Sequence, residues 1–337
     1  MKHKILNSQG KEVLLNAEEK RIAKLNQRHV NALGAKIDIT TLTTIIKSVT
    51  EQKFFEIAPA DYIPVQVGEG AWGVELTTFR SFDLGGDFET GIINTGASNA
   101  RLAQADAGVD SVSIAIQNWA KGVNWSKPEL EFAQRAVNFD LITAKEKSRK
   151  RNWDLGIQKT AFLGLDIAGI SGLFTQAGTT INLTTITKAI STMTGAELKA
   201  FCAVVLGNYR TNCVNTAWPT HFVIPESDYL GLAAPSSADF PLKSVLEVLQ
   251  DTFKIMTKNP NFQIMPCAYA DAANNSLGAQ RYALYNADPE SIRMDIPVDY
   301  TSTLAATMNN FQFESVAYGQ FTGVKAYRPT ELLYFEF

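Results

Sequence analysis

The chain has 337 residues, of which 45% are hydrophobic and 19% are charged, and its formal net charge is −3. This composition excludes a disordered or collagen-like chain and indicates a globular protein with a sizeable core. No apolar run reaches the roughly 18 residues of a membrane-spanning helix. The basic start of the chain lacks the apolar stretch of a secretory signal, so we expect synthesis in the cytosol.

Charge is distributed unevenly along the chain. The net charge is +4 over residues 1–60, −6 over 61–120, +4 over 121–164 and −5 over the remainder. Complementary potentials favour encounter and register, so the acidic segment of one copy is suited to lie on a basic segment of another. Charges scattered over unrelated surfaces are the alternative.

The first sixty residues are predicted to form an arm rather than a domain. Residues 16–34 carry strong helix signals, with Asn16 as the N-cap and Gly34 just past the end. Residues 37–55 are a second, shorter amphipathic candidate. Neither segment has enough neighbouring sequence to bury its apolar face, so the arm needs another surface to lie on.

Residues 65–125 are predicted to form a long two-stranded excursion with a loose tip. Apolar and polar residues alternate in VELTTFRSF and in VDSVSIAIQNW, and the sequence between them is rich in turn residues. The excursion begins with the literal motif GEGAWG, Gly68 to Gly73. A dinucleotide site needs a helix after these glycines, whereas a strand pattern follows, which favours a hinge.

Residues 126–164 carry the strongest helix signals in the chain. Ser126 and Glu129 form a capping box, Pro128 lies in the first turn, and Gly164 closes the far end. A continuous helix of this length would span about 54 Å, so its middle would be exposed or would touch a neighbour. A break near Asn152 is the alternative.

From residue 165 onward, helices and strands are mixed. Thr194 and Glu197 form a second capping box, and Pro241 begins LKSVLEVLQDTF. Strands are predicted at HFVIP, FQIMPCAYA and RYALY. After Asp288 the pattern is almost entirely β, and the last strand ends at Phe337. We expect this strand to be paired within a sheet.

No motif for catalysis, metal binding or cofactor binding is present. The three histidines are far apart, no GxSxG or GK[ST] motif occurs, and the cysteines Cys202, Cys213 and Cys267 form no CxxC pair. We expect buried free thiols, and no catalytic, metal-binding or cofactor-binding residues. Aromatic residues lie beside the acidic segment. We expect them to anchor this segment against another protein chain or to pack between its two strands. Stacking on nucleic acid is less favoured, because it needs positive charge among the aromatic residues.

The order of these segments resembles a known family. The long helix ends at Gly164, the junction GLFTQ follows, and the chain closes on GVKAYRPTELLY. In this order the chain resembles a tailed-phage major capsid protein of the Hong Kong 97 type, close to the encapsulin-like branch. The resemblance covers essentially the whole chain in architecture and implies the α+β Hong Kong 97-type capsid fold.

The resemblance also implies a division of the chain. The N-terminal arm would be residues 1–62, the extended β-hairpin loop 63–125, the spine helix of the peripheral domain 126–164, the axial domain 165–290, and the strands completing both domains 291–337.

The implied function is structural. Copies would form pentamers and hexamers that close into an icosahedral shell around double-stranded DNA, assembled in the host cytoplasm, with portal, scaffold or decoration proteins as further partners. The resemblance implies no enzyme activity and no membrane partner. Some members of the family lose an N-terminal segment. We do not expect this removal here, because the arm carries ordinary helix signals. Some crosslink through a lysine in the extended loop, but residues 54–120 contain no lysine.

Two sets of residues are candidates for contacts between subunits. The first set is acidic and aromatic and lies in the excursion: Asp83, Asp87, Phe88 and Glu89. The second set is the run KEKSRKR on the long helix: Lys145, Lys147, Arg149, Lys150 and Arg151. At about 100° per residue these charges encircle the helix instead of forming one stripe for a DNA groove. Charge facing packaged DNA and plain solvated surface are the alternatives.

Three other functions are less favoured. An encapsulin-like compartment would enclose protein cargo in place of a genome. A nucleotide-dependent enzyme would use GEGAWG and would need a helix after Gly73. A DNA-binding protein would use KEKSRKR, and its affinity would fall steeply with salt.

Overall fold

The computed structural model describes residues 4–6, 12–14, 53, 55–68, 72–84, 106–137, 140–234, 243–307, 309 and 311–337. The chain divides into two units, one of residues 1–54 and 132–139 and one of residues 55–131 and 140–337.

In the first unit, β1 (Lys4–Leu6) and β2 (Glu12–Leu14) form an antiparallel pair that the sequence reasoning did not anticipate. The helix predicted at 16–34 lies outside the described residues, as does most of the one predicted at 37–55.

A five-stranded sheet of the second unit lies between two hydrophobic cores. Its strand order is β11 (Gln263–Cys267), β10 (His221–Pro225), β12 (Arg281–Tyr285), β18 (Leu332–Glu336) and β9 (Thr180–Asn182). Along β10, Phe222 and Ile224 join one core and Val223 joins the other, because successive side chains point to opposite faces. The expectation that the last strand is paired within a sheet is confirmed, since β18 lies between β12 and β9.

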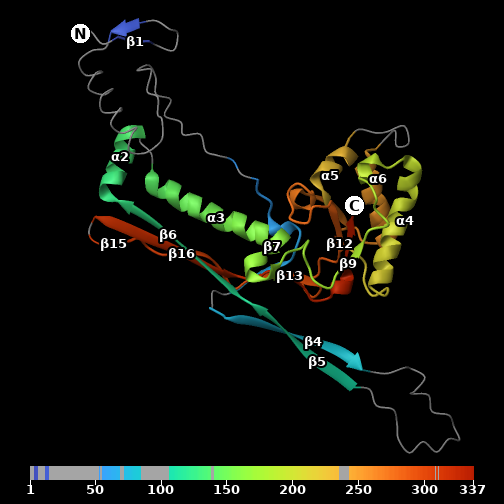
Figure 1. Ribbon diagram of the computed structural model, residues 1–337. Helices are drawn as coiled ribbons and strands as arrows, with labels where there is room; N and C mark the ends of the chain where they lie inside the picture. Colours follow the sequence, from blue (N-terminus) through green and yellow to red (C-terminus); the bar gives the residue numbers. More distant parts are fainter. Residues whose placement is uncertain are drawn as a thin grey trace, which may run out of the picture. The chain divides into compact units, whose positions relative to one another are not determined.

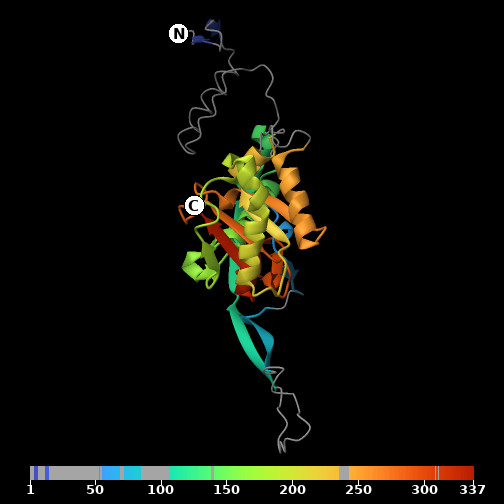
Figure 2. The same ribbon diagram turned by 90° about the vertical axis from the view of Figure 1, so that its right-hand side faces the viewer.

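Two long helices contribute to the core on one face of this sheet. α4 (Gly195–Asn212) begins at the predicted capping box of Thr194 and Glu197, and α6 (Val245–Thr257) is capped by Ser244. The short helix α5 (Glu226–Leu232) directly follows β10. The two long helices pack side by side, with the rings of Phe201 and Phe253 in edge contact (Figures 1 and 2).

The helix predicted over residues 126–164 is two helices, α2 (Lys127–Val137) and α3 (Leu141–Leu163). The predicted capping box is confirmed by hydrogen bonds of 3.3 and 3.4 Å between Ser126 and Glu129. A second N-cap starts α3, because the Asp140 side chain accepts the N–H of Thr143 at 3.2 Å. The break therefore lies before Leu141 and not near Asn152, and α3 is about 34 Å long. Gly164 ends α3 as predicted, with φ +79°.

α3 packs against a long antiparallel sheet. β6 (Gln117–Ser126) and β16 (Gln312–Phe321) pair along their full length, and β14 (Val298–Ser302) and β15 (Ala306–Thr307) pair with β16. The ring of Trp153 on α3 lies 5.1 Å from that of Trp119 on β6. On β16 only a glycine fits beneath this ring, because a Cβ at Gly319 would lie 2.5 Å from Trp153.

The remaining elements are short. A three-stranded sheet has the order β17 (Val324–Ala326), β13 (Ile292–Ile296), β3 (Val65–Val67), and β7 (Gly164–Leu165) pairs with β8 (Ile170–Ser171). The 3-10 helices are η1 (Pro59–Asp61), η3 (Asp166–Ala168), η4 (Ile190–Thr192), η5 (Ala268–Ala270) and η6 (Pro329–Glu331).

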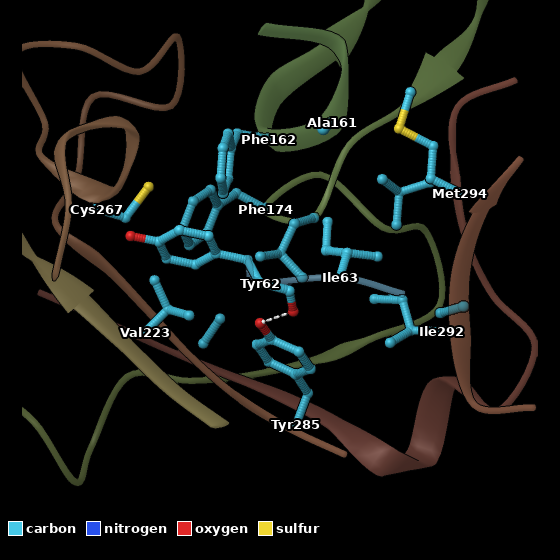
Figure 3. Packing of buried hydrophobic residues seen from close by; sticks show 14 of the residues in the cluster. Tyr62, Ile63, Ala161, Phe162, Phe174, Val223, Cys267, Tyr285, Ile292 and Met294 are labelled. Carbon is cyan, nitrogen blue, oxygen red and sulfur yellow. Dashed lines mark hydrogen bonds between the residues drawn. The ribbon is translucent and has the colours of Figure 1, made fainter. Parts of the chain in front are cut away.

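The segment before β3 is anchored in the core beneath α3. Tyr62 and Ile63 are buried there, and the ring of Tyr62 lies edge-on to that of Phe162 at 5.1 Å (Figure 3). The Tyr285 hydroxyl donates to the Tyr62 carbonyl at 2.6 Å. The chain entering the second unit is therefore held by both packing and hydrogen bonds.

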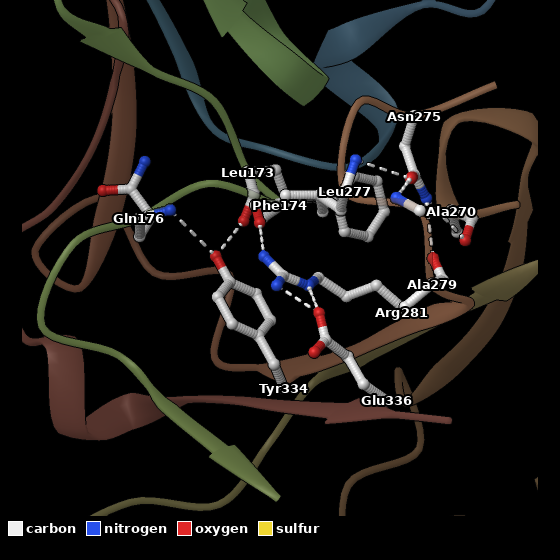
Figure 4. A network of polar contacts seen from close by, with 11 residues as sticks. Leu173, Phe174, Gln176, Ala270, Asn275, Leu277, Ala279, Arg281, Tyr334 and Glu336 are labelled. Carbon is white, nitrogen blue, oxygen red and sulfur yellow. Dashed lines mark hydrogen bonds and ion pairs between the residues drawn. The ribbon is translucent and has the colours of Figure 1, made fainter. Parts of the chain in front are cut away.

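The GLFTQ junction is fixed by a polar network (Figure 4). Arg281 on β12 contacts Glu336 on β18 and donates to the Phe174 carbonyl. The Tyr334 hydroxyl donates to the Leu173 carbonyl and accepts the N–H of Gln176 at 3.2 Å. This motif is therefore an anchor between α3 and the five-stranded sheet.

Candidate assembly surfaces

Part of the predicted excursion forms an antiparallel hairpin of two ten-residue strands, β4 (Glu75–Leu84) and β5 (Asp106–Ala115). The two ends of the predicted range belong to other sheets, because β3 pairs with β13 and β6 pairs with β16. Among the described residues, β4 and β5 pair only with each other. Phe79 is 71% exposed and Val109 is 69% exposed. An isolated two-stranded hairpin is marginally stable in water, and its exposed apolar side chains suit contact with another surface.

The base of the hairpin is fixed to the long sheet through the GEGAWG motif. The Gly73 N–H donates to Gln320 Oε1 at 3.1 Å, and Gln320 Nε2 donates back to the Gly73 carbonyl at 2.9 Å. A Cβ at Gly68 would lie 2.6 Å from the Pro297 carbonyl oxygen. The strand β4 follows the motif, so the helix that a nucleotide site requires is absent. At Gly68 the missing side chain allows this close approach to the backbone of Pro297.

The acidic and aromatic candidates of the excursion fall mostly outside what the structure describes. Asp83 belongs to β4 and pairs with Ala107, but its side chain is not described. Asp87, Phe88 and Glu89 lie outside the described residues. The described part adds two exposed carboxylates on β5, Asp106 and Asp110, which the sequence reasoning did not single out.

The basic run on α3 is divided between an inner and an outer group. Lys145 belongs to the inner group: its ammonium donates to the Asn124 carbonyl at 2.9 Å and to Glu129 at 2.8 Å. The hydrogen bond from Lys145 lowers the pKa of Glu129 below its usual range. This contact ties the start of α3 to β6 and to the capping box of α2.

Arg149 is also in the inner group and is only 2% exposed. Its guanidinium donates to the Ser315 carbonyl at 2.6 Å and to the hydroxyls of Ser302, Tyr300 and Ser315 at 2.8, 3.0 and 3.2 Å. The geometry removes Arg149 from the candidates for contact with a neighbour, because its donors are used inside its own chain.

A sequence signal for this burial exists. Arg149, Trp153, Ile157 and Ala161 recur every four residues along α3, and all four are buried. Residues at this spacing lie on one helix face. Counting the apolar stripe backwards from Ala161 would have placed Arg149 on the buried side.

The outer group of the run is Lys147, Lys150 and Arg151. The side chains of Lys147 and Lys150 are exposed. Arg151 is partly covered, and its Nε lies 3.7 Å from the Glu56 carboxylate of the same chain. Lys147 and Lys150 are therefore the members of the run whose positive charge is best placed to meet another molecule.

Neither a metal-ligand cluster nor a membrane-spanning helix is found among the described residues. They hold no cluster of three or more potential metal ligands. None of their helices is long and apolar enough to cross a membrane. The cysteines are free and buried as predicted, and burial raises the pKa of Cys202 and of Cys267 to about 12. Such thiols stay protonated at neutral pH.

Comparison with known proteins shows the family to which the chain belongs. The model of a family described as major capsid protein matches residues 89–336. The chain belongs to the major capsid protein family. It is therefore a structural protein that forms a phage capsid shell by association of copies of itself, and the resemblance inferred from sequence is confirmed.

Solved capsid structures share the fold at low sequence identity. The capsid of Myoviridae phage XM1 has a TM-score of 0.72 and 18% identity over 90% of this chain and 99% of that chain. The Microbacterium phage Oxtober96 structure has a TM-score of 0.57 and 11% identity over 92% of this chain and 97% of that chain. The mature capsid of bacteriophage PhiM1 has a TM-score of 0.53 and 10% identity over 88% of this chain and 91% of that chain. These likenesses establish the mixed α+β fold of Hong Kong 97-type capsids. No curated protein matches the sequence.

Proposed function

We propose that copies of this capsid protein assemble in the host cytoplasm into pentamers and hexamers that close into an icosahedral shell around double-stranded DNA. The observation that carries the proposal is the β4–β5 hairpin, which exposes large apolar side chains and pairs with no other described strand. A neighbouring copy would supply the surface that the hairpin lacks. Portal, scaffold and decoration proteins are the further partners of such a shell.

The subdomains are assigned accordingly. Residues 1–62 are the arm, 63–125 the extended loop, 126–164 the spine segment, 165–290 the axial domain and 291–337 the completing strands. The strand pairings support the last assignment, because β16 joins the long sheet beside α3 and β18 joins the five-stranded sheet. The spine segment comprises α2 and α3 in place of one continuous helix.

The contacts that hold the shell are noncovalent in this proposal. Residues 54–120 contain no lysine for a crosslink from the extended loop. Residues 61–120 carry a net charge of −6, and Lys147 and Lys150 present positive charge on α3. The acidic loop of one copy would then lie on this basic surface of a neighbour, or on its basic arm, because opposite potentials favour that register.

Charge reversal tests this contact. We expect the triple variant Asp83→Lys, Asp87→Lys and Glu89→Lys to give few or no closed particles, because like charges then face each other. Adding Lys147→Glu and Lys150→Glu to the triple variant is expected to restore a substantial share of them. Particles are counted by negative-stain microscopy at low ionic strength, where charge contacts are least screened. Intact, well-formed particles of the triple variant would show that the acidic loop does not make this contact.

The contents of the shell distinguish a genome capsid from a compartment. We expect purified particles from infected or induced cells to protect double-stranded DNA from nuclease. Particles that hold protein cargo and no DNA would instead support the encapsulin-like alternative.

A further inference from the structure

An open hollow with a volume of about 620 Å³ lies where three segments of the second unit meet. It is lined by the turn after α4 (Thr216 to Trp218), by Asn286 after β12, and by Arg328, Thr330 and Glu331 at η6. Ligand pockets are typically about 300 to 1,000 Å³. The last three residues belong to the closing motif GVKAYRPTELLY, between β17 and β18.

The walls of the hollow are held in place by the last turn of α4. The Tyr209 hydroxyl donates to the Glu331 carbonyl at 2.9 Å, and Asn212 Nδ2 donates to the Thr330 carbonyl at 2.7 Å. The Arg210 guanidinium lies 4.3 Å from the centre of the Trp218 ring. A preorganised lining loses little freedom when a ligand binds, which favours affinity.

The lining of the hollow offers both donors and acceptors, and Arg328 is the cation among its residues. Arg328 makes two contacts, one to exposed Glu290 at 2.9 Å and one to buried Glu331 at 3.4 Å, and a guanidinium has five N–H groups. Trp218 and Thr330 also line the hollow, and both residues are exposed. The remaining N–H groups of Arg328 favour a ligand that accepts hydrogen bonds.

The buried and exposed carboxylates around Arg328 have different roles. Asn286 Nδ2 donates to Glu331 at 3.2 Å, so Glu331 is fixed at the floor and orients Arg328 from inside. Glu290 is 76% exposed and contacts Arg328 from outside. Exposed ion pairs are weak, so another carboxylate can take the place of Glu290 on Arg328. Trp218, 43% exposed, offers an apolar surface in the same hollow.

We propose that this hollow binds a carboxylate joined to an apolar group, with the carboxylate on Arg328 and the apolar group on the Trp218 ring. The same chemistry occurs in an acidic residue beside an apolar one in another copy of this chain, and in a separate small carboxylate. Glu331 offsets part of the positive charge, so recognition rests on the fork of N–H donors more than on net charge.

Titration calorimetry of the full chain with two probes tests the site. N-acetyl-Leu-Glu-amide is expected to bind, and N-acetyl-Leu-Gln-amide is expected to bind much more weakly. Arg328→Gln should lower the affinity for the acidic probe by about tenfold, the value of a charge-assisted hydrogen bond. Lys199→Gln removes one exposed positive charge from α4 outside the hollow and should leave the affinity unchanged.

A second variant keeps the test independent of folding effects. Glu290→Gln removes the competing carboxylate at an exposed position and should raise the affinity for the acidic probe by about two- to fivefold. Equal affinity of the two probes, or an unchanged affinity in both Arg328→Gln and Glu290→Gln, would overturn the proposal. Repeating the titration on assembled particles identifies the source of the ligand: binding lost on assembly means that another copy fills the hollow, and binding retained means a separate molecule.

Discussion

Arg149→Ala is expected to lower the free energy of unfolding by about 3 to 5 kcal/mol. The guanidinium of Arg149 fills a buried position and donates to four oxygen atoms from Tyr300, Ser302 and Ser315. The substitution removes the donor of all four acceptors, of which the carbonyl and the hydroxyl of Ser315 are buried, and leaves a cavity between α3 and the long sheet. The measurement is urea unfolding of the unassembled chain, followed by tryptophan fluorescence.

The adjacent residue provides a matched control. Lys150→Ala removes the same formal charge one position further along the run, at an exposed site. Surface substitutions of this kind change stability by about 0.5 kcal/mol or less. If Arg149→Ala and Lys150→Ala had equal effects, α3 would not be held to β14 and β16 through this guanidinium.

Gly172→Ala is expected to destabilise the chain by about 3 kcal/mol, at the upper end of what overpacking usually costs. An added Cβ would lie 2.5 Å from the Gly164 nitrogen and 2.5 Å from the carbonyl carbon and oxygen of Phe162. These are backbone atoms at the end of α3, so no side-chain rotation relieves the overlap. The effect is measured as the shift in the midpoint of urea unfolding and in the yield of folded protein.

Gly156→Ala is the control, and it is expected to change the stability in the opposite direction to Gly172→Ala. Gly156 lies inside α3, and a Cβ there meets nothing within 4 Å. Replacing an exposed helical glycine with alanine raises stability by about 0.5 to 1 kcal/mol. A destabilisation by Gly156→Ala similar to that of Gly172→Ala would mean that the close approach at Gly172 is not the cause.

Local patterns were enough to predict the strands that form the core. The segments HFVIP and RYALY coincide with β10 and β12, because strands buried on both faces read as short apolar runs. The capping boxes at Ser126 and Thr194 were equally readable, because both hydrogen-bond partners lie within three residues.

The division of the long helix was missed for a local reason. Ser126 and Gly164 already supply a start and an end, so the prediction of one helix takes no account of a second N-cap at Asp140. Aspartate is nevertheless a strong N-cap, and its bond to Thr143 was available to sequence reasoning. An aspartate such as Asp140 inside a long helical span is therefore a sequence signal for the start of a second helix.

The burial of Arg149 could not be read from the charges alone. Its partners Tyr300, Ser302 and Ser315 lie more than 150 residues further along the chain and are uncharged, so no complementary charge marks the contact. The four-residue spacing from Arg149 to Trp153 indicates the inner face of α3, but the partners of Arg149 are shown only by the fold.

Electron microscopy of the purified protein tests the central claim most directly. The account predicts closed particles, or pentamers and hexamers that close into them, built from the 37.0 kDa chain. Sedimentation would show the same material as large species at concentrations where a monomer would remain slow. A chain that stays monomeric under all assembly conditions, with no capsomers or particles on the grid, would contradict the account.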